Sequence, residues 1–159
     1  MKADVIKRIA NELSKANMIY IIGNGGSAAL SDHFACDLLK NCNLPAISLC
    51  SNLALITAIA NDVSFEEIFA LQLDNLFKKD DVLIAFSTRG TSPNIVAAVK
   101  KICNGEKGTV IGVAGFDGGE LKKWSHEFYH IDSFNMQECE DEMNEICHAI
   151  YNELYPEKT

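Results

Sequence analysis

Two short segments of the chain combine glycines with hydroxyl side chains. Residues 23–27 read Gly-Asn-Gly-Gly-Ser, and residues 87–92 read Ser-Thr-Arg-Gly-Thr-Ser. Hydroxyl groups donate hydrogen bonds to phosphate oxygens, and glycine lets the backbone come close to a ligand. Either segment alone is also typical of an ordinary turn or helix N-cap. The two together predict a site that binds a phosphate group.

The elements that flank these segments support that prediction. Continuous apolar runs at residues 18–22 and 82–86 end directly before them and indicate buried strands. Residues 27–39 and 93–103 follow as expected helices, the second with Pro93 in its first turn. Helix N-termini favour anions, and ligands of parallel sheets bind beyond the carboxyl ends of the strands. We therefore expect the two segments to meet at one edge of a sheet.

Strand and helix patterns alternate along the rest of the chain. Further strands are expected at residues 46–50, 109–114 and 128–131, and further helices at 5–13, 52–60, 65–77, 119–124 and 136–154. The central strands are apolar throughout, which is typical of a parallel sheet covered by helices on both faces. The sequence thus predicts one α/β domain over residues 1–159, with a five-stranded, doubly wound, flavodoxin-like parallel sheet.

The first segment also matches a dinucleotide-binding pattern. Gly23, Gly25 and Ala28 satisfy G-x-G-x-x-A. That motif requires an acidic residue about 20 positions later to hold the ribose. Residues 48–52 contain none, and the chain has no Walker A motif. We therefore favour a phosphorylated sugar over a nucleotide.

Composition narrows the function classes further. The chain has 159 residues and a formal net charge of −8, which argues against nucleic acid as a partner. No run reaches the ~20 apolar residues of a membrane helix, and residues 1–13 lack the apolar core of a signal peptide. The six cysteines form no C-x-x-C pair. They are expected to be reduced thiols of a cytoplasmic protein.

Similarity to a known family runs through nearly the whole chain, in five stretches. These are residues 23–29 (GNGGSAA), 33–35 (HFA), 55–62 (LITAIAND), 87–94 (STRGTSPN) and 115–119 (GFDGG). They resemble the phosphoheptose isomerases, which are sugar-isomerase (SIS) domain proteins. The resemblance implies a five-stranded parallel sheet, assembly as a homo-oligomer (dimer or tetramer), and interconversion of sedoheptulose 7-phosphate with a heptopyranose 7-phosphate.

The same resemblance assigns residues that bind the substrate. The phosphate positions of the family fall on Ser27, Ser87, Thr88 and Ser92. Asn24 and Asp62 match positions that face the sugar. The remaining candidates for substrate contact are the neighbouring loop residues and one residue of the last helix, namely Gly25, Gly26, Arg89 and Gln137.

Catalysis would require a base, an acid and, in this family, a metal. Aldose–ketose isomerisation moves a proton between adjacent carbons through an enediol. His33 and Asp37 are four residues apart and share one helix face. The resemblance makes Asp37 the base and Glu145 or His148 the partner acid. It implies one divalent metal, zinc in the family, with the ligands His33, Asp37, Gln137 and Glu145.

Departures from the family pattern keep other functions open. Asp37 replaces a glutamate and is one methylene shorter, and Glu145 replaces a histidine. Arg89 stands where most isomerases have serine, and matches a related replication-initiation regulator. The alternative is therefore a non-catalytic member that senses a phosphosugar or binds a replication initiator. Isomerisation of a different sugar phosphate is a third possibility. His126 and His130 receive no role.

Overall fold

The protein is built on a single sheet of five parallel strands. The computed structural model describes residues 2–105 and 108–155. The strands are β1 (Ile19–Ile22), β2 (Ala46–Ser48), β3 (Asp81–Phe86), β4 (Gly108–Ala114) and β5 (Glu127–His130). Their order across the sheet is β2-β1-β3-β4-β5. This order is that of flavodoxin-like doubly wound folds, so the predicted fold class is confirmed.

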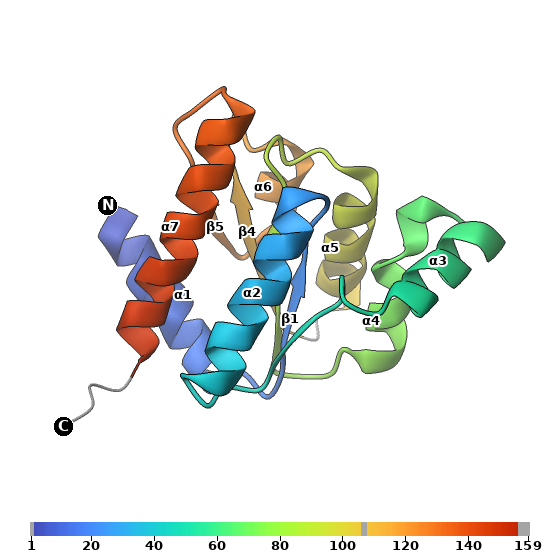
Figure 1. Ribbon diagram of the computed structural model, residues 1–159, viewed down its shortest axis with the longest axis horizontal. Coiled ribbons are helices and arrows are strands. Elements are labelled where there is room, and N and C mark those ends of the chain that lie inside the picture. The colour runs from blue at the N-terminus through green and yellow to red at the C-terminus, as the bar shows by residue number, and fades with distance from the viewer. Residues whose placement is uncertain (1, 106–107, 156–159) are drawn as a thin grey trace.

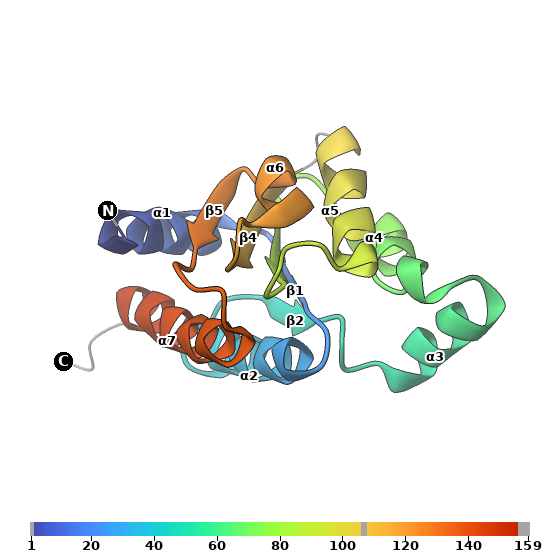
Figure 2. The same cartoon turned by 90° about the horizontal axis from the view of Figure 1, so that it is seen from above.

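Helices cover both faces of the sheet (Figures 1 and 2). One face carries α1 (Lys2–Lys15), α2 (Gly26–Lys40) and α7 (Met136–Leu154). The other carries α3 (Leu53–Asp62), the 3₁₀ turn η1 (Phe65–Glu67), α4 (Ala70–Leu76), α5 (Pro93–Gly105) and α6 (Gly119–Trp124). In Figure 2, α2 and α7 lie side by side on one side of the strands, which is the pairing that later defines the site.

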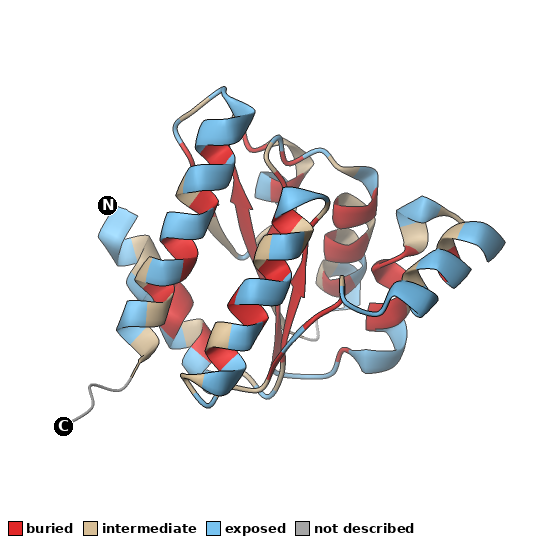
Figure 3. Cartoon of the chain, viewed as in Figure 1, coloured by how far each residue is buried: buried red, intermediate tan, exposed pale blue. Residues whose placement is uncertain are grey.

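Strand alternation divides the apolar residues between two cores. On β1, Ile19 and Ile21 face the core of α1, α2 and α7, while Tyr20 and Ile22 face the core of α3 to α6. All four are buried, as the continuous apolar run of this strand predicts. Figure 3 shows the buried strands between helices whose outer faces are exposed. The sheet is thus a rigid, dry support for the loops at its edge.

Two elements differ in extent from the sequence pattern, one strand being shorter and one helix being divided. Strand β2 stops at Ser48 because the next residues turn: the Cys50 N–H donates to Ser48 Oγ, and Ser51 Oγ donates to the Ser48 carbonyl. The expected helix at 65–77 is divided into η1 and α4. Ile68 and Phe69 between them are both 2% exposed, and the tighter turn before them lets consecutive side chains reach the core.

None of the helices within residues 2–105 and 108–155 combines the length and the apolarity that crossing a membrane requires.

Candidate functional site

The two hydroxyl-rich loops lie next to each other at the carboxyl edge of the sheet. β1 pairs with β3, and Ile22 is opposite Ala85, so the segments that follow these strands emerge side by side. They enclose a pocket of about 280 Å³. It is lined by Asn24, Gly25, Gly26, Ser27, Phe86, Ser87, Thr88, Ser92, Met136 and Glu140. Most of the predicted substrate-binding positions are therefore brought together.

Donor groups of both loops face this pocket. Ser27 and Ser87 are each 5% exposed, and the Ser87 and Ser92 hydroxyls are 3.1 Å apart. Helix α2 begins behind the first loop with Gly25 at its N-cap, and no side chain caps it. The N–H groups of Ser27, Ala28 and Ala29 donate to the carbonyls of Asn24 and Gly25, so this helix end attracts an anion through its dipole. The pocket thus offers hydroxyl donors and the positive end of a helix, which suit an anion.

Glycines are required where the second loop touches a neighbouring turn. Gly90 has a φ of 68°, which favours glycine. A Cβ built on Gly90 would overlap the carbonyl oxygen of Gly118, and a Cβ on Gly119 would be 2.6 Å from the carbonyl oxygen of Gly90. The phosphate loop and the turn before α6 therefore pack backbone against backbone.

A second pocket continues from the first along the seam between α2 and α7. It measures about 300 Å³ and is lined by Gly26, Ser27, Ala29, Leu30, His33, Glu140, Met143 and Asn144. Gly26, Ser27 and Glu140 line both pockets. The two hollows therefore form one groove, which starts at the hydroxyl-rich loops and passes His33.

Glu140 was not selected from the sequence, where it belongs to the acidic run 138–142. In the structure its carboxylate atoms lie 3.5 Å from the position that a Cβ on Gly26 would occupy. The spacing could have indicated it, because residues 140, 144 and 148 are four apart and share one helix face. That face of α7 is the one that meets α2.

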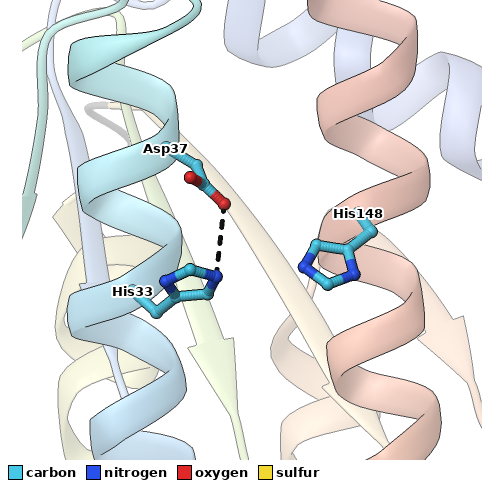
Figure 4. A group of neighbouring side chains, drawn as sticks. All are labelled: His33, Asp37 and His148. Carbon is cyan, nitrogen blue, oxygen red and sulfur yellow. Dashed lines mark ion pairs between the residues drawn. The ribbon is translucent and has the colours of Figure 1, made fainter.

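A cluster of titratable side chains lies further along the same seam (Figure 4). His33 Nε2 is 3.4 Å from Asp37 Oδ2, and Asn41 Nδ2 donates to Asp37 Oδ1 at 3.4 Å. The rings of His33 and His148 are 6.1 Å apart and nearly perpendicular. One ligand atom from each of His33, Asp37 and His148 lies within 4.8 Å of the others.

This cluster has the donor chemistry of a transition-metal site. Two imidazoles and a carboxylate are common zinc ligands. Two ligands on a tetrahedral zinc ion, with bonds of about 2.0–2.1 Å, are roughly 3.3 Å apart. The 3.4 Å between His33 and Asp37 fits that value. Cys147 is buried beside His148, and burial, followed by the charge of Asp37, raises the pKa of its thiol, which therefore stays neutral.

Comparisons with known proteins identify the family to which the chain belongs. A family model described as the SIS domain matches residues 3–115. The chain belongs to the SIS domain family. Within it, the resemblance to phosphoheptose isomerases is confirmed. The phosphoheptose isomerase of Helicobacter pylori is 44% identical over 118 residues, which are 71% of this chain and 61% of that protein.

Other SIS domain relatives match over more of their length. The DnaA initiator-associating protein DiaA of Pectobacterium atrosepticum is 37% identical over 164 aligned residues, covering 93% of this chain and 81% of that protein. The structure of phosphoheptose isomerase GmhA from Neisseria gonorrhoeae superposes with a TM-score of 0.89 at 28% identity. It covers 94% of this chain and 84% of that one. Both phosphoheptose isomerases and a DnaA initiator-associating protein are thus among the relatives.

Of the catalytic and metal-binding residues predicted on α7, the structure brings only some to the cluster on α2. His148 joins His33 and Asp37, whereas Glu145 is exposed and outside the cluster. At 100° per residue, Glu145 projects about 60° away from His148 around the helix. Gln137 is exposed and lines neither part of the groove. Gln137 and Glu145 are eight residues apart, and so are Glu140 and His148, three residues further along. The second pair lies on the side of α7 that faces α2.

Two further predicted contacts lie outside the groove of the SIS domain. Arg89 is exposed, and its guanidinium carbon is 5.3 Å from the centre of the Phe116 ring. Asp62 ends α3 on the other side of the molecule from α7, and its Oδ1 accepts a hydrogen bond from Asn61. Neither residue lines the two pockets of the groove.

Proposed function

We propose that this protein is a phosphosugar isomerase of the phosphoheptose type. The observation that carries the proposal is the groove, which leads from an anion pocket to His33, and His33 forms a cluster of titratable side chains with Asp37 and His148. A phosphate pocket alone would serve any phosphosugar-binding protein. Asp37 and His148, which cluster with His33, would supply the base and the acid that aldose–ketose isomerisation also requires.

The spacing along α2 suits a long sugar chain. Six residues separate Ser27, in the phosphate pocket, from His33, which corresponds to about 9 Å of helix. A seven-carbon chain carrying a terminal phosphate is roughly 10 Å long when extended, given bonds near 1.5 Å. With its phosphate held by Ser27, Ser87, Thr88 and Ser92, the sugar's first two carbons would reach the cluster.

The cluster can then move the protons of the reaction. The Asp37 carboxylate takes the proton from the carbon next to the carbonyl, and His148 gives a proton to the carbonyl oxygen. This produces the enediol. Asp37 then returns its proton to the former carbonyl carbon, and His148 recovers one from the adjacent hydroxyl, which becomes the new carbonyl. Asn41, which donates to Asp37 Oδ1, and His33, beside Oδ2, hold the carboxylate in place.

One divalent metal ion fits the donors of the cluster. His33, Asp37 and His148 would hold it, in place of the set with Gln137 and Glu145 expected from the sequence. Two nitrogens and one oxygen favour an ion of the zinc type. When bound, the ion would polarise the carbonyl oxygen of the sugar.

The experiment that tests this function is a direct assay for the product. The purified protein is incubated with sedoheptulose 7-phosphate, with and without added Zn²⁺ or Mn²⁺, and the aldose product is followed by NMR. Product at a rate well above a protein-free control supports the isomerase. Thermal stabilisation by the sugar phosphate without product would contradict it and favour the second candidate.

The second candidate is a non-catalytic regulator that binds a phosphosugar or a replication initiator. It is favoured by the DiaA relative, whose alignment covers 93% of this chain. It is also favoured by Arg89, which packs on Phe116 outside the groove and is available to a protein partner. In that case the phosphate pocket would serve as a sensor, and the shortened carboxylate of Asp37 would have no catalytic role.

Self-association is part of the proposal. Helix α3 has Ile59 as its only buried residue, and exposed apolar side chains gather at its ends. These are Leu53, Leu55, Val63 and Phe65, of which Leu53 is 72% exposed. Residues 51–61 carry no charge, in a chain whose net charge is −8. An uncharged stretch is where two such acidic chains repel each other least, so we assign residues 51–61 to the contact with a second copy in a dimer or tetramer.

Residues 1–159 would form one SIS domain of a cytoplasmic protein. The location is supported by the six cysteines, all of which are free thiols.

A further inference from the structure

Two asparagines connect the hydroxyl-rich loops to each other. Asn24 belongs to the first loop, and Asn94 follows the second loop in the first turn of α5. Asn24 Nδ2 donates to Asn94 Oδ1 at 2.8 Å, and Asn94 Nδ2 donates to Asn24 Oδ1 at 2.8 Å. Asn94 is 2% exposed, and its Oδ1 also accepts the N–H of Ile95 at 3.0 Å. The pair is therefore reciprocal, and its Asn94 side is shielded from water.

Apart from this pair, each loop forms hydrogen bonds to a different side of the sheet, the first loop toward β2 and the second toward β4. The Gly23 carbonyl of the first loop accepts from Cys50 Sγ, after β2. In the second loop, the Ser87 N–H donates to Val113, and the Thr88 carbonyl accepts from Gly115, on the β4 side. Among residues 2–105 and 108–155, no other hydrogen bond joins 23–27 to 87–94. The asparagine pair alone ties one loop to the other.

We infer that Asn24 and Asn94 are positioning residues that hold the two loops at the separation needed to bind one phosphate. The inference rests on the proposed phosphosugar site. It differs from the expectation that Asn24 faces the sugar, because each amide already uses a donor and an acceptor within the pair. Two partly buried hydrogen bonds between the side-chain amides restrict both loops before the ligand arrives, which lowers the entropy cost of binding.

The test measures the backbone mobility of the two loops without ligand, and the affinity of the protein for its ligand. The variants are Asn24→Ala, Asn94→Ala and the double substitution, with Asn11→Ala, at an exposed position on α1, as the matched control. Hydrogen exchange followed by mass spectrometry reports the amides of residues 23–27 and 87–92. Calorimetry with sedoheptulose 7-phosphate and with inorganic phosphate reports affinity.

Each single substitution should speed hydrogen exchange in both loops and weaken ligand binding about tenfold. The double variant should show exchange rates and an affinity no worse than those of either single variant, because both substitutions remove the same interaction. Asn94→Asp has the same shape and keeps the acceptor for the Ile95 N–H, so it replaces Asn94→Ala if that variant does not fold.

Three results would overturn the inference. Exchange could rise only in the loop that carries the substitution. The effects of the two single variants could add in the double variant. Asn24→Ala could weaken binding while Asn94→Ala leaves it unchanged, which would make Asn24 a direct contact. If the unaltered protein bound neither ligand, the proposed function would fail, and the exchange data would still decide whether the pair positions the loops.

Discussion

His33 and His148 approach each other from two different helices, with their rings 6.1 Å apart and nearly perpendicular. His33 comes from α2, directly behind the first phosphate loop, and His148 comes from α7 at the end of the chain. Their meeting, together with Asp37, forms the cluster to which we assign the acid–base and metal-binding roles, and His33 connects this cluster to the groove.

His148 should be essential for turnover, and Glu145 should not. His148→Gln removes the proton donor of the cluster and should lower kcat at least about 100-fold, the usual contribution of a general acid. Glu145→Gln, three residues earlier on the same helix but pointing to solvent, is the matched control and should keep nearly full activity. The NMR assay with sedoheptulose 7-phosphate measures both. The reverse order of effects would restore Glu145 as the acid.

Asp37→Asn should abolish turnover while sugar-phosphate binding stays intact. The amide is isosteric with the carboxylate but cannot accept the proton from carbon, whereas the phosphate pocket lies more than one helical turn away. Turnover is measured by NMR and affinity by calorimetry. Asp32→Asn, an exposed position on the same helix, serves as the control. Unchanged turnover in Asp37→Asn would remove Asp37 from the mechanism.

Zinc should stabilise the protein through the cluster. An ion that binds only the folded state at 100 times its Kd adds about 2.7 kcal/mol to the free energy of unfolding. Thermal melting with and without Zn²⁺ should show a rise in Tm that a chelator reverses. His33→Ala and His148→Ala should each lose most of that rise, and Glu145→Gln should retain it. Equal stabilisation of all four proteins would place the ion elsewhere.

The sheet and its two faces follow directly from the apolar runs of the sequence. Residues 82–86 are buried throughout, and the resulting strand fixes where the second loop must be. Which side of α7 meets α2 does not follow in the same way, because spacing alone permits Gln137 with Glu145 as well as Glu140 with His148. Tertiary packing decides between them: Met143, Ile146 and Cys147 are buried, which turns Glu145 outward.

The orientation of the Arg89 side chain could likewise not be predicted from the sequence. A guanidinium within a phosphate-binding motif predicts a phosphate contact. The Phe116 ring, 27 residues later, offers a competing partner whose position is known only once β4 is paired with β3.

Glu140→Gln should strengthen binding of inorganic phosphate several-fold. The carboxylate lines the anion pocket beside Gly26, and a like charge near a partly exposed anion costs on the order of 1 kcal/mol. The effect should shrink at 1 M salt, where the Debye length is about 3 Å. Calorimetry at two salt concentrations checks this, with Glu145→Gln as the control. Weaker phosphate binding in Glu140→Gln would mean that the carboxylate does not face the anion.

Leu53→Asp should shift the protein toward the monomer. Leu53 is 72% exposed at the start of helix α3, in the uncharged stretch 51–61, and a buried unpaired carboxylate at a contact between copies is strongly unfavourable. Sedimentation velocity measures the distribution of species over a concentration series. Leu39→Asp, at an apolar position of α2 that is 58% exposed, is the comparison. Dissociation by Leu39→Asp alone would assign the contact to α2, and a monomeric parent protein would refute self-association.

The backbone contact of Gly90 with Gly118 and Gly119 also restricts how this protein can evolve. Any side chain at position 90 must separate two turns that each support the phosphate pocket, so a single mutation there damages the site before it can alter it. The side chains at positions 89 and 91 are exposed, so exchange there should leave the backbone contact in place. We therefore expect new ligand preferences to arise through the neighbours of Gly90 and through the α2–α7 groove, with the glycine contact retained.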